Sequence, residues 1–354
     1  MSKTNKFIII SACIFFAAAA SILLAQKSSA PTKKIKDMDD RVVEVPVNPQ
    51  RIACLHGVSN ERIITLGKGS SLAMMGGGPA DWIYKYYPEL KNVMVVGAHS
   101  TTDIEKMLNL KVDLVIYSPN PGAAEKYREA GISTVCGFAE QKRPRNIEDF
   151  KNNFKRQYRF FGDLFDAETK ARVDKYCAYF DAKINKILAI TSKIKDKDKP
   201  TVYYGGRSGT FYSTQGRDSV LHWFVKIAGG NYLPAAIDKN YAEANMEQVL
   251  GWNPDIILLS GYAPNINLSK TPALASMSAV KNNKVHRIPR GFFMWELASG
   301  ESVLFAIYIA KIFHPEQFKD WNMANEMKTF YSEIYKKNVS DEDINKILKA
   351  LPSS

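Results

Sequence analysis

One segment of the chain occurs twice, and this repeat restricts the possible folds more than any other feature. Residues 102–118 read TDIEKMLNLKVDLVIYS and residues 244–260 read ANMEQVLGWNPDIILLS, and four identical residues match at a constant offset of 142. Each copy begins with a short amphipathic pattern behind a polar residue, which predicts a helix. Each copy ends in an unbroken aliphatic run, which is typical of a strand buried on both faces of a parallel sheet.

The distance between the two copies indicates two lobes. Units of solenoid proteins have about 20 to 50 residues, far fewer than separate these copies. The chain has 354 residues, of which 45% are hydrophobic. That is enough for two cores, because domains usually have about 100 to 200 residues. We therefore expect an α/β fold with two lobes, mostly parallel sheets and a cleft between the lobes.

A long helix is predicted between the two copies. Residues 167–193 contain no Gly or Pro and carry apolar residues at helical spacing. Alternating strand and helix patterns precede and follow this segment. The sequence thus predicts an N-terminal lobe over residues 39–166, a connecting helix over 167–193 and a C-terminal lobe over 200–354. A single helix is a stiff connector, so we expect the lobes to rock through small angles.

The first thirty residues belong to neither lobe. Lys3 and Lys6 precede an apolar run over residues 7–25, and small residues dominate its second half. This layout favours a secretory signal peptide over a membrane anchor, although the run is long enough to span a bilayer. Residues 10–13 also match a bacterial lipoprotein box, so three fates of the leader stay open.

The net charge and the cysteines exclude some classes of function. The formal net charge is +12, but the basic residues are scattered and no basic stripe interleaved with aromatics is present. A solvated basic surface explains this better than a nucleic-acid partner does. Beyond the leader, Cys54, Cys136 and Cys177 form an odd set without CxxC spacing. We expect them to be buried rather than to form disulfides or a zinc site.

Candidate ligand-binding residues lie in the loops that follow predicted strands, because open α/β sheets bind ligands beyond the carboxyl ends of their strands. Two histidines of one lobe, facing a basic and aromatic wall from the other, could hold a metal complex. Each feature also has a structural explanation: His56 could cap the next helix, the glycines could allow close backbone approach, and the aromatics could be core. The five loops contain His56, Gly76–Pro79, His99, Arg207 and Arg290–Trp295.

No catalytic signature accompanies these loops. The motifs HExxH and GxSxG are absent from the sequence, as is a convincing pair of catalytic carboxylates. We therefore predict no catalytic residues. Two alternatives remain: a two-lobed metal- or cofactor-binding enzyme with His56 or His99 as base, and a receptor for a bare metal ion with three or four converging ligands.

Taken together, these segments resemble the substrate-binding proteins of iron-siderophore and cobalamin ABC importers. The resemblance covers residues 39–318 and includes RIACLHGVSNERIITLG, both copies of the repeat, the long helix and LASGESVLFAIYIAKIFHPE. It implies two Rossmann-like lobes bridged by one rigid helix and a ligand held in the cleft. It also implies a periplasmic monomer without intrinsic cofactor, which delivers its ligand to a permease dimer in the inner membrane.

The resemblance assigns a role to the repeated glutamates. In this family a glutamate at the start of this helix in each lobe docks onto permease arginines, and Glu105 and Glu247 occupy those positions. A carboxylate in the first turn of a helix is stabilised by the helix dipole and stays ionised for such a pair. Glutamate is also common there for capping reasons alone, but its presence in both copies favours docking.

One departure from the family concerns the ligand. Members that bind tris-catecholate iron complexes place arginines in the loops after the repeated strands, whereas residues 118–120 and 260–262 contain none. We therefore predict a less charged metal chelate, such as a ferric siderophore or a nickel or iron chelate, with His99 as a metal ligand. The predicted ligand-binding residues are His56, Gly77, Gly78, His99, Arg207, Tyr241, Arg290, Phe292 and Trp295.

Overall fold

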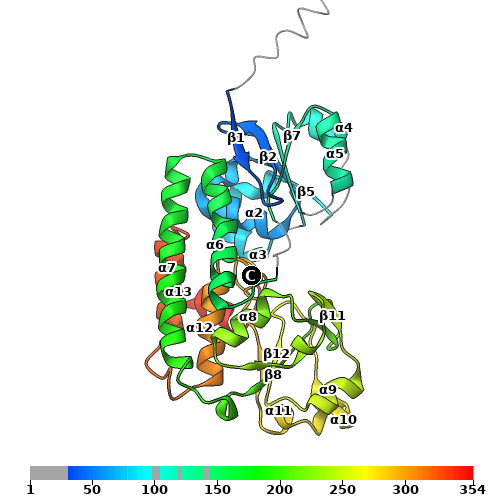
Figure 1. Cartoon of the computed structure of the whole chain (residues 1–354), viewed down its shortest axis with the longest axis vertical. Coiled ribbons are helices and arrows are strands. Elements are labelled where there is room, and N and C mark those ends of the chain that lie inside the picture. The colour runs from blue at the N-terminus through cyan, green and yellow to red at the C-terminus, as the bar shows by residue number, and fades with distance from the viewer. Residues whose placement is uncertain (1–30, 78, 98–103, 119–120, 139–142, 354) are drawn as a thin grey trace, which may run out of the picture.

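The protein has two α/β lobes joined by long helices (Figure 1). The computed structural model describes residues 31–77, 79–97, 104–118, 121–138 and 143–353. Each lobe contains a parallel sheet, and α7 (Ala167–Thr191) runs along one side of both lobes. The predicted α/β class, the mostly parallel sheets and the long connecting helix are confirmed.

The N-terminal lobe is built around a five-stranded parallel sheet with the order β5-β4-β3-β6-β7. A two-stranded antiparallel hairpin, β1 (Thr32–Lys36) and β2 (Val42–Pro46), precedes it. The sheet strands are β3 (Ile52–Cys54), β4 (Leu72–Gly76), β5 (Met94–Val96), β6 (Leu114–Tyr117) and β7 (Ser133–Cys136). The helices between them are α2 (Gly57–Ile63), α3 (Asp81–Tyr86), α4 (Ile104–Asn109) and α5 (Pro121–Glu129).

The C-terminal lobe has a four-stranded parallel sheet with the order β10-β8-β12-β13. Its strands are β8 (Thr201–Gly205), β10 (Asn231–Tyr232), β12 (Ile256–Leu259) and β13 (Val285–Arg287), and an antiparallel pair is formed by β9 (Ser213–Gln215) and β11 (Tyr241–Glu243). Its helices are α8 (Val220–Ile227), α9 (Met246–Trp252), α10 (Pro272–Ala275), α11 (Ser278–Lys281) and α12 (Ser302–Phe313).

The sequence repeat forms the same unit in each lobe, α4 followed by β6 and α9 followed by β12. Both strands are fully buried and lie beside the first strand of their sheet. The repeated aspartate explains part of this likeness. The Asp113 carboxylate accepts backbone N–H bonds of 2.8 and 3.1 Å from Gln50 and Arg51, just before β3. The Asp255 carboxylate accepts the N–H of Thr201 at 2.8 Å, at the start of β8. Each aspartate thus fixes the first strand of its lobe against the repeated strand.

Two antiparallel helices connect the lobes. α6 (Ile147–Leu164) packs along α7 through stacked aromatic rings, including Phe154 on Phe180, whose centroids are 4.7 Å apart. The Asp166 side chain accepts the N–H of Thr169 at 2.9 Å and caps α7, which ends at Thr191. This helix pair therefore presents a continuous apolar seam to both lobes.

The last two helices, α13 (Met323–Glu333) and α14 (Asp341–Leu348), return to the N-terminal lobe. The Asp343 carboxylate accepts bonds from Lys85 Nζ at 2.8 Å and from the Tyr86 hydroxyl at 2.5 Å, both on α3. The region assigned to the C-terminal lobe thus also holds the other lobe in place. The lobe boundaries themselves stay predictions.

The three cysteines that follow the leader are free and buried, as predicted. Burial raises the pKa of the Cys54 and Cys136 thiols to about 12. Among the residues that the structure describes, no helix is both long and apolar enough to cross a bilayer. The predicted leader, residues 1–30, lies outside the described residues.

We expect the repeated aspartates to contribute to stability in both lobes. Asp113→Ala and Asp255→Ala should each lower the free energy of unfolding by about 1–2 kcal/mol, because each leaves backbone donors without their charged acceptor. Urea unfolding measures the change, and Asp320→Ala, at an exposed position, serves as the control. Equal stability of the repeat variants and the control would contradict this role.

Candidate functional site

In each sheet the strand order reverses direction at one point, and these two points lie on either side of one cleft. In the N-terminal lobe the chain adds β4 and β5 on one side of β3 and then β6 and β7 on the other. In the C-terminal lobe β10 and β12 flank β8 in the same way. Ligands of open α/β sheets bind beyond the carboxyl ends of strands at such a point. His56 follows β3 and Arg207 follows β8, so the two predicted site loops occupy equivalent positions.

Residues from both lobes line a cavity of ≈ 270 Å³ in this cleft. Four of the predicted site residues come together there, namely His56, Gly77, Arg207 and Tyr241. The cavity is also lined by residues that were not predicted, among them Phe138, Gln215, Asp218, Asn240, Phe293 and Met294.

His56 is held in place by side-chain contacts on the N-terminal wall. It occupies the residue before α2, where its side chain makes no capping bond to the helix backbone. Its Nδ1 lies 3.0 Å from Ser59 Oγ, and its ring centroid lies 4.5 Å from that of Phe138. His56 is 8% exposed. The capping alternative is therefore not supported, and the imidazole is a fixed part of the cleft wall.

The glycine loop after β4 has two different roles. A Cβ on Gly76 would lie 2.6 Å from the backbone of Leu55, so this glycine allows two strand ends to approach each other, and it also lines the cleft. Gly77 has φ 76°, in the left-handed region that favours glycine, and lines the cleft. Gly78 and His99, the predicted metal ligand, lie outside the described residues.

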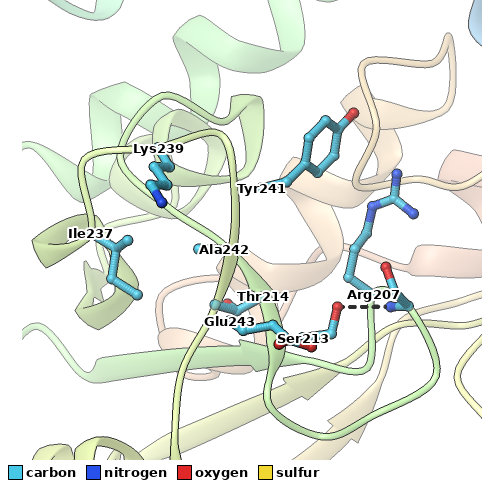
Figure 2. A pocket seen from close by; sticks show the side chains of 9 residues that line it. Arg207, Ser213, Thr214, Ile237, Lys239, Tyr241, Ala242 and Glu243 are labelled. Carbon is cyan, nitrogen blue, oxygen red and sulfur yellow. Dashed lines mark hydrogen bonds between the residues drawn. The ribbon is translucent and has the colours of Figure 1, made fainter.

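Arg207 and Tyr241 form the opposite wall. Arg207 lies in the turn after β8, which its N–H closes by a 3.1 Å bond to the carbonyl of Ser213. Its guanidinium carbon lies 5.2 Å from the centroid of the Tyr241 ring, within the range of a cation–π contact. Figure 2 shows the guanidinium extending toward this ring. Tyr241 is 59% exposed, so an aromatic surface is available beside the cation.

One cation of the cleft, Arg207, has the buried carboxyl group of Glu296 as an electrostatic neighbour but not as an ion-pair partner. Asp218 also lines the cleft, but Arg143 pairs with it through Nε at 2.9 Å and also reaches Asp238 at 2.9 Å. Among the described residues no carboxylate forms an ion pair with Arg207. The described part of the cleft therefore favours a ligand of low negative charge.

The structure corrects the selection of aromatic residues in the loop after β13. Phe292 and Trp295 are both 0% exposed and do not line the cleft. Phe292 stacks on Tyr331, with centroids 4.9 Å apart, and belongs to the core. Phe293 and Met294 face the cleft instead. The segment does reach the cleft, but it bends and turns over residues 292–298, so its sequence does not show which side chains face the cleft.

Arg290 also differs from its predicted role. Its Nη2 lies 2.9 Å from Asp81 Oδ1 of α3, and its guanidinium carbon lies 4.6 Å from the centroid of the Tyr262 ring. It does not line the cleft. Arg290 is thus engaged in a contact between the lobes, which leaves Arg207 as the cation of the cleft in the described residues.

Two buried carboxylates hold the aromatic loop and the lobes together. The Glu301 carboxylate accepts the N–H groups of Phe292 at 3.1 Å and Phe293 at 2.7 Å and the hydroxyl of Tyr331. Glu61 of α2 accepts the N–H of Gly300 at 3.3 Å and the hydroxyl of Tyr335.

Burial raises the pKa of Glu61 and raises that of Glu301 to about 7. The two carboxylates thus accept the hydrogen bonds that the buried N–H groups of the loop would otherwise make to water.

A second cavity of ≈ 570 Å³ adjoins the cleft and shares Arg207 and Tyr241 with it. Figure 2 shows Lys239 and Glu243 among the residues around it. The cleft therefore opens into a polar chamber formed by the β9 and β11 pair.

No group of three or more His, Cys, Asp or Glu side chains in the described part of the chain could hold a metal ion together. His56 is the histidine of that part that lines the cleft.

Glu105 and Glu247 lie in the first turns of α4 and α9, and both are exposed. The two helices lie on the side of the molecule away from α7 (Figure 1). Each lobe thus offers one glutamate on a surface that is separate from the cleft residues. Their docking role stays a prediction.

Several cleft residues could not be singled out from the sequence. Gln215 and Asp218 follow Arg207 along the chain, but only the arginine was predicted to bind the ligand. Phe138 follows β7 and reads as an ordinary strand-end aromatic. Their place at the cleft depends on the antiparallel β9 and β11 pair and on how the lobes face each other, which no local pattern encodes.

The chain was compared with known proteins. A family model described as periplasmic binding protein matches residues 52–290. The molybdate-binding protein MolA of Haemophilus influenzae is 23% identical over 330 residues, which cover 87% of this chain and 92% of MolA.

Solved structures share the fold. The structure of H. influenzae MolA bound to molybdate has a TM-score of 0.77 at 20% identity and covers 87% of this chain and 99% of that one. Helicobacter pylori CeuE in a nickel–histidine complex has a TM-score of 0.69 at 18% identity, covering 90% and 99%. At these identities the likeness shows the two-lobed architecture.

The buried Glu301 makes stability depend on pH. Its folded-state pKa of about 7 lies above the ordinary 4.5, so the folded state binds more protons between these values. Stability should therefore be highest near pH 5 and fall as the pH rises through 7, with Glu301 contributing up to about 3 kcal/mol of that loss.

Urea unfolding of the wild type and of Glu301→Gln at pH 5, 7 and 8 measures this contribution. The variant, which cannot ionise at this position, should lose less stability than the wild type over the same range. Parallel pH profiles of the two proteins would contradict the assignment.

Proposed function

The chain belongs to the periplasmic binding protein family, and from that premise we propose that it captures a compact metal chelate of low negative charge between its lobes. It delivers this ligand to the permease of an ABC importer in the inner membrane. Members of the family are periplasmic binding proteins and not enzymes. The alternative of an enzyme with His56 or His99 as base is therefore not retained.

The observation that carries the proposal is the meeting of two sheet reversal points at one cavity. His56 from the N-terminal lobe and Arg207 from the C-terminal lobe line the same space. A ligand that contacts both residues binds the lobes to each other. Ligand binding can thus change the relative orientation of the two lobes, and a permease can recognise this change.

The balance of charged residues in the cleft supports a ligand of low negative charge. Arg207 lacks an ion pair among the described residues, whereas Arg143 balances Asp218 and Asp81 balances Arg290. A trianionic complex would bring more negative charge than this cleft compensates. One or two negative charges match it better.

The size of the cleft admits a small chelate. The cavity of ≈ 270 Å³ joins the chamber of ≈ 570 Å³ at Arg207 and Tyr241, and together they lie within the usual range of about 300–1,000 Å³ for pockets that bury drug-sized ligands. Two similar proteins are named or solved with small metal-containing ligands, molybdate for MolA and nickel–histidine for CeuE. A nickel or iron chelate fits this size class, and His99 remains the proposed metal ligand.

Delivery requires a surface for the permease. We propose that Glu105 and Glu247, one on each lobe, form ion pairs with basic residues of the permease. Their exposure and their equivalent positions in the repeat support this role. A change in the relation of the lobes would change the distance between the two carboxylates.

Calorimetry with a panel of ferric and nickel chelates and with molybdate tests the ligand class. At least one chelate should bind tightly, and Arg207→Ala should weaken it about 10- to 100-fold because a charge-assisted hydrogen bond is lost. Arg159→Ala, an exposed substitution on α6, is the matched control and should keep the wild-type affinity. If no chelate binds, the proposed function is wrong.

Uptake of the bound chelate in cells tests the docking surface. Glu105→Arg and Glu247→Arg should abolish uptake while leaving calorimetric affinity unchanged, because the substitutions reverse a charge needed for the permease and not for the ligand. Glu168→Arg, in the first turn of α7, reverses the same kind of charge elsewhere and should transport normally. Normal uptake by both docking variants would rule out this surface.

A further inference from the structure

Two hydrogen-bond donors in the cleft wall have no partner. Gln215 Nε2 and Arg207 Nε are both buried atoms without a hydrogen-bond acceptor. Among the described residues with such atoms, Arg207 and Gln215 are the two that line the cleft. Gln215 is 1% exposed as a whole, so bulk water does not solvate its amide. A buried unpaired donor costs about 1–3 kcal/mol and therefore needs an explanation.

The two donors belong to one constellation. Gln215 is the last residue of β9, and in the antiparallel pair it lies directly opposite Tyr241. Opposite residues of such a pair lie on the same face of the strands. The Tyr241 ring in turn lies over the Arg207 guanidinium. Gln215 and Arg207 thus flank one aromatic ring at the junction of the cleft and the outer chamber.

The position of Gln215 is rigid. Its carbonyl accepts a 2.5 Å bond from the hydroxyl of Tyr232, and the neighbouring Thr214 hydroxyl donates to the carbonyl of Tyr204 at 2.6 Å. The strand carrying the amide is therefore fixed to β8 and β10. The strand thus holds the amide at the cleft wall, where a ligand in the cleft can reach it.

We propose that Gln215 is a specificity-determining residue, which together with Arg207 binds a carboxylate of the chelate. This inference rests on the proposed function and narrows its ligand class. A carboxylate supplies two acceptor oxygens for the unpaired donors and an ion pair for Arg207, which has none among the described residues, and guanidinium groups bind carboxylates through paired hydrogen bonds. A site built around such donors rejects a ligand without the acceptor, because the donors would stay unpaired.

Calorimetry with two carboxylate-bearing probes, nickel–histidine and ferric citrate, and with nickel–histamine tests the inference. Histamine is histidine without its carboxylate. At least one carboxylate-bearing probe should bind the wild type at least about 10-fold more tightly than nickel–histamine. Gln215→Leu should weaken that probe about 10- to 50-fold, and Gln215→Glu should weaken it further by repulsion. Gln317→Leu, an exposed substitution, should leave affinity unchanged.

Thermal unfolding separates this role from a structural one. Without ligand, Gln215→Leu should have a Tm equal to or above that of the wild type, because it removes an unpaired buried donor. A lowered Tm would mean that the amide supports the fold, and would overturn the inference.

The failures of the two proposals differ. Unchanged affinity in Gln215→Leu, or binding confined to chelates without a carboxylate, overturns the role of Gln215 and leaves the proposed function standing. If neither these probes nor any panel chelate binds, both proposals fall.

Discussion

A buried polar network between the lobes is the constraint on which the site depends. Glu61 and Arg62 of α2 are 1% and 0% exposed, and buried charges are tolerated only when they are hydrogen-bonded. Arg62 Nη2 donates to Gln157 Oε1 and to the carbonyl of Ala298, each at 2.7 Å, whereas its Nε and Nη1 have no hydrogen-bond partner among the described residues. Glu61 accepts the N–H of Gly300. Three parts of the chain, α2, α6 and the turn before α12, are thereby joined. Removing one partner from such a network costs more than the pair contributes, because an uncompensated charge stays behind.

The network determines which side chains of the aromatic loop line the cleft. Glu301 binds the N–H groups of Phe292 and Phe293 and so determines which aromatic enters the core and which faces the cleft. Gly57, at the start of α2, leaves room for the Phe293 ring, since a Cβ there would lie 3.2 Å from Phe293 Cζ. The polar network, the aromatic loop and the cleft wall therefore form one unit. The other wall of the cleft is formed by residues of β9 and β11 and of the turn after β8.

Much of the architecture could be predicted because it is encoded locally and twice. The repeat predicted two lobes, the long uninterrupted helical pattern predicted α7, and the rule that ligands bind after strands led to His56 and Arg207.

Phe292 and Trp295 were chosen wrongly because composition marks a loop but not the direction of its side chains. Arg290 was wrongly assigned to the cleft because its ion-pair partner, Asp81, lies in the other lobe and far away in the sequence. Glu61 and Arg62 look like surface residues of a short helix, and their burial arises only when the lobes meet.

The central claim is that a metal chelate lies between His56 and Arg207. A crystal structure of the protein with its tightest chelate, measured at the absorption edge of the metal, tests this most directly. An anomalous peak within the cleft, with ligand density in contact with Arg207, is the expected result. A peak outside the cleft, or ligand density that contacts only one lobe, would contradict the claim.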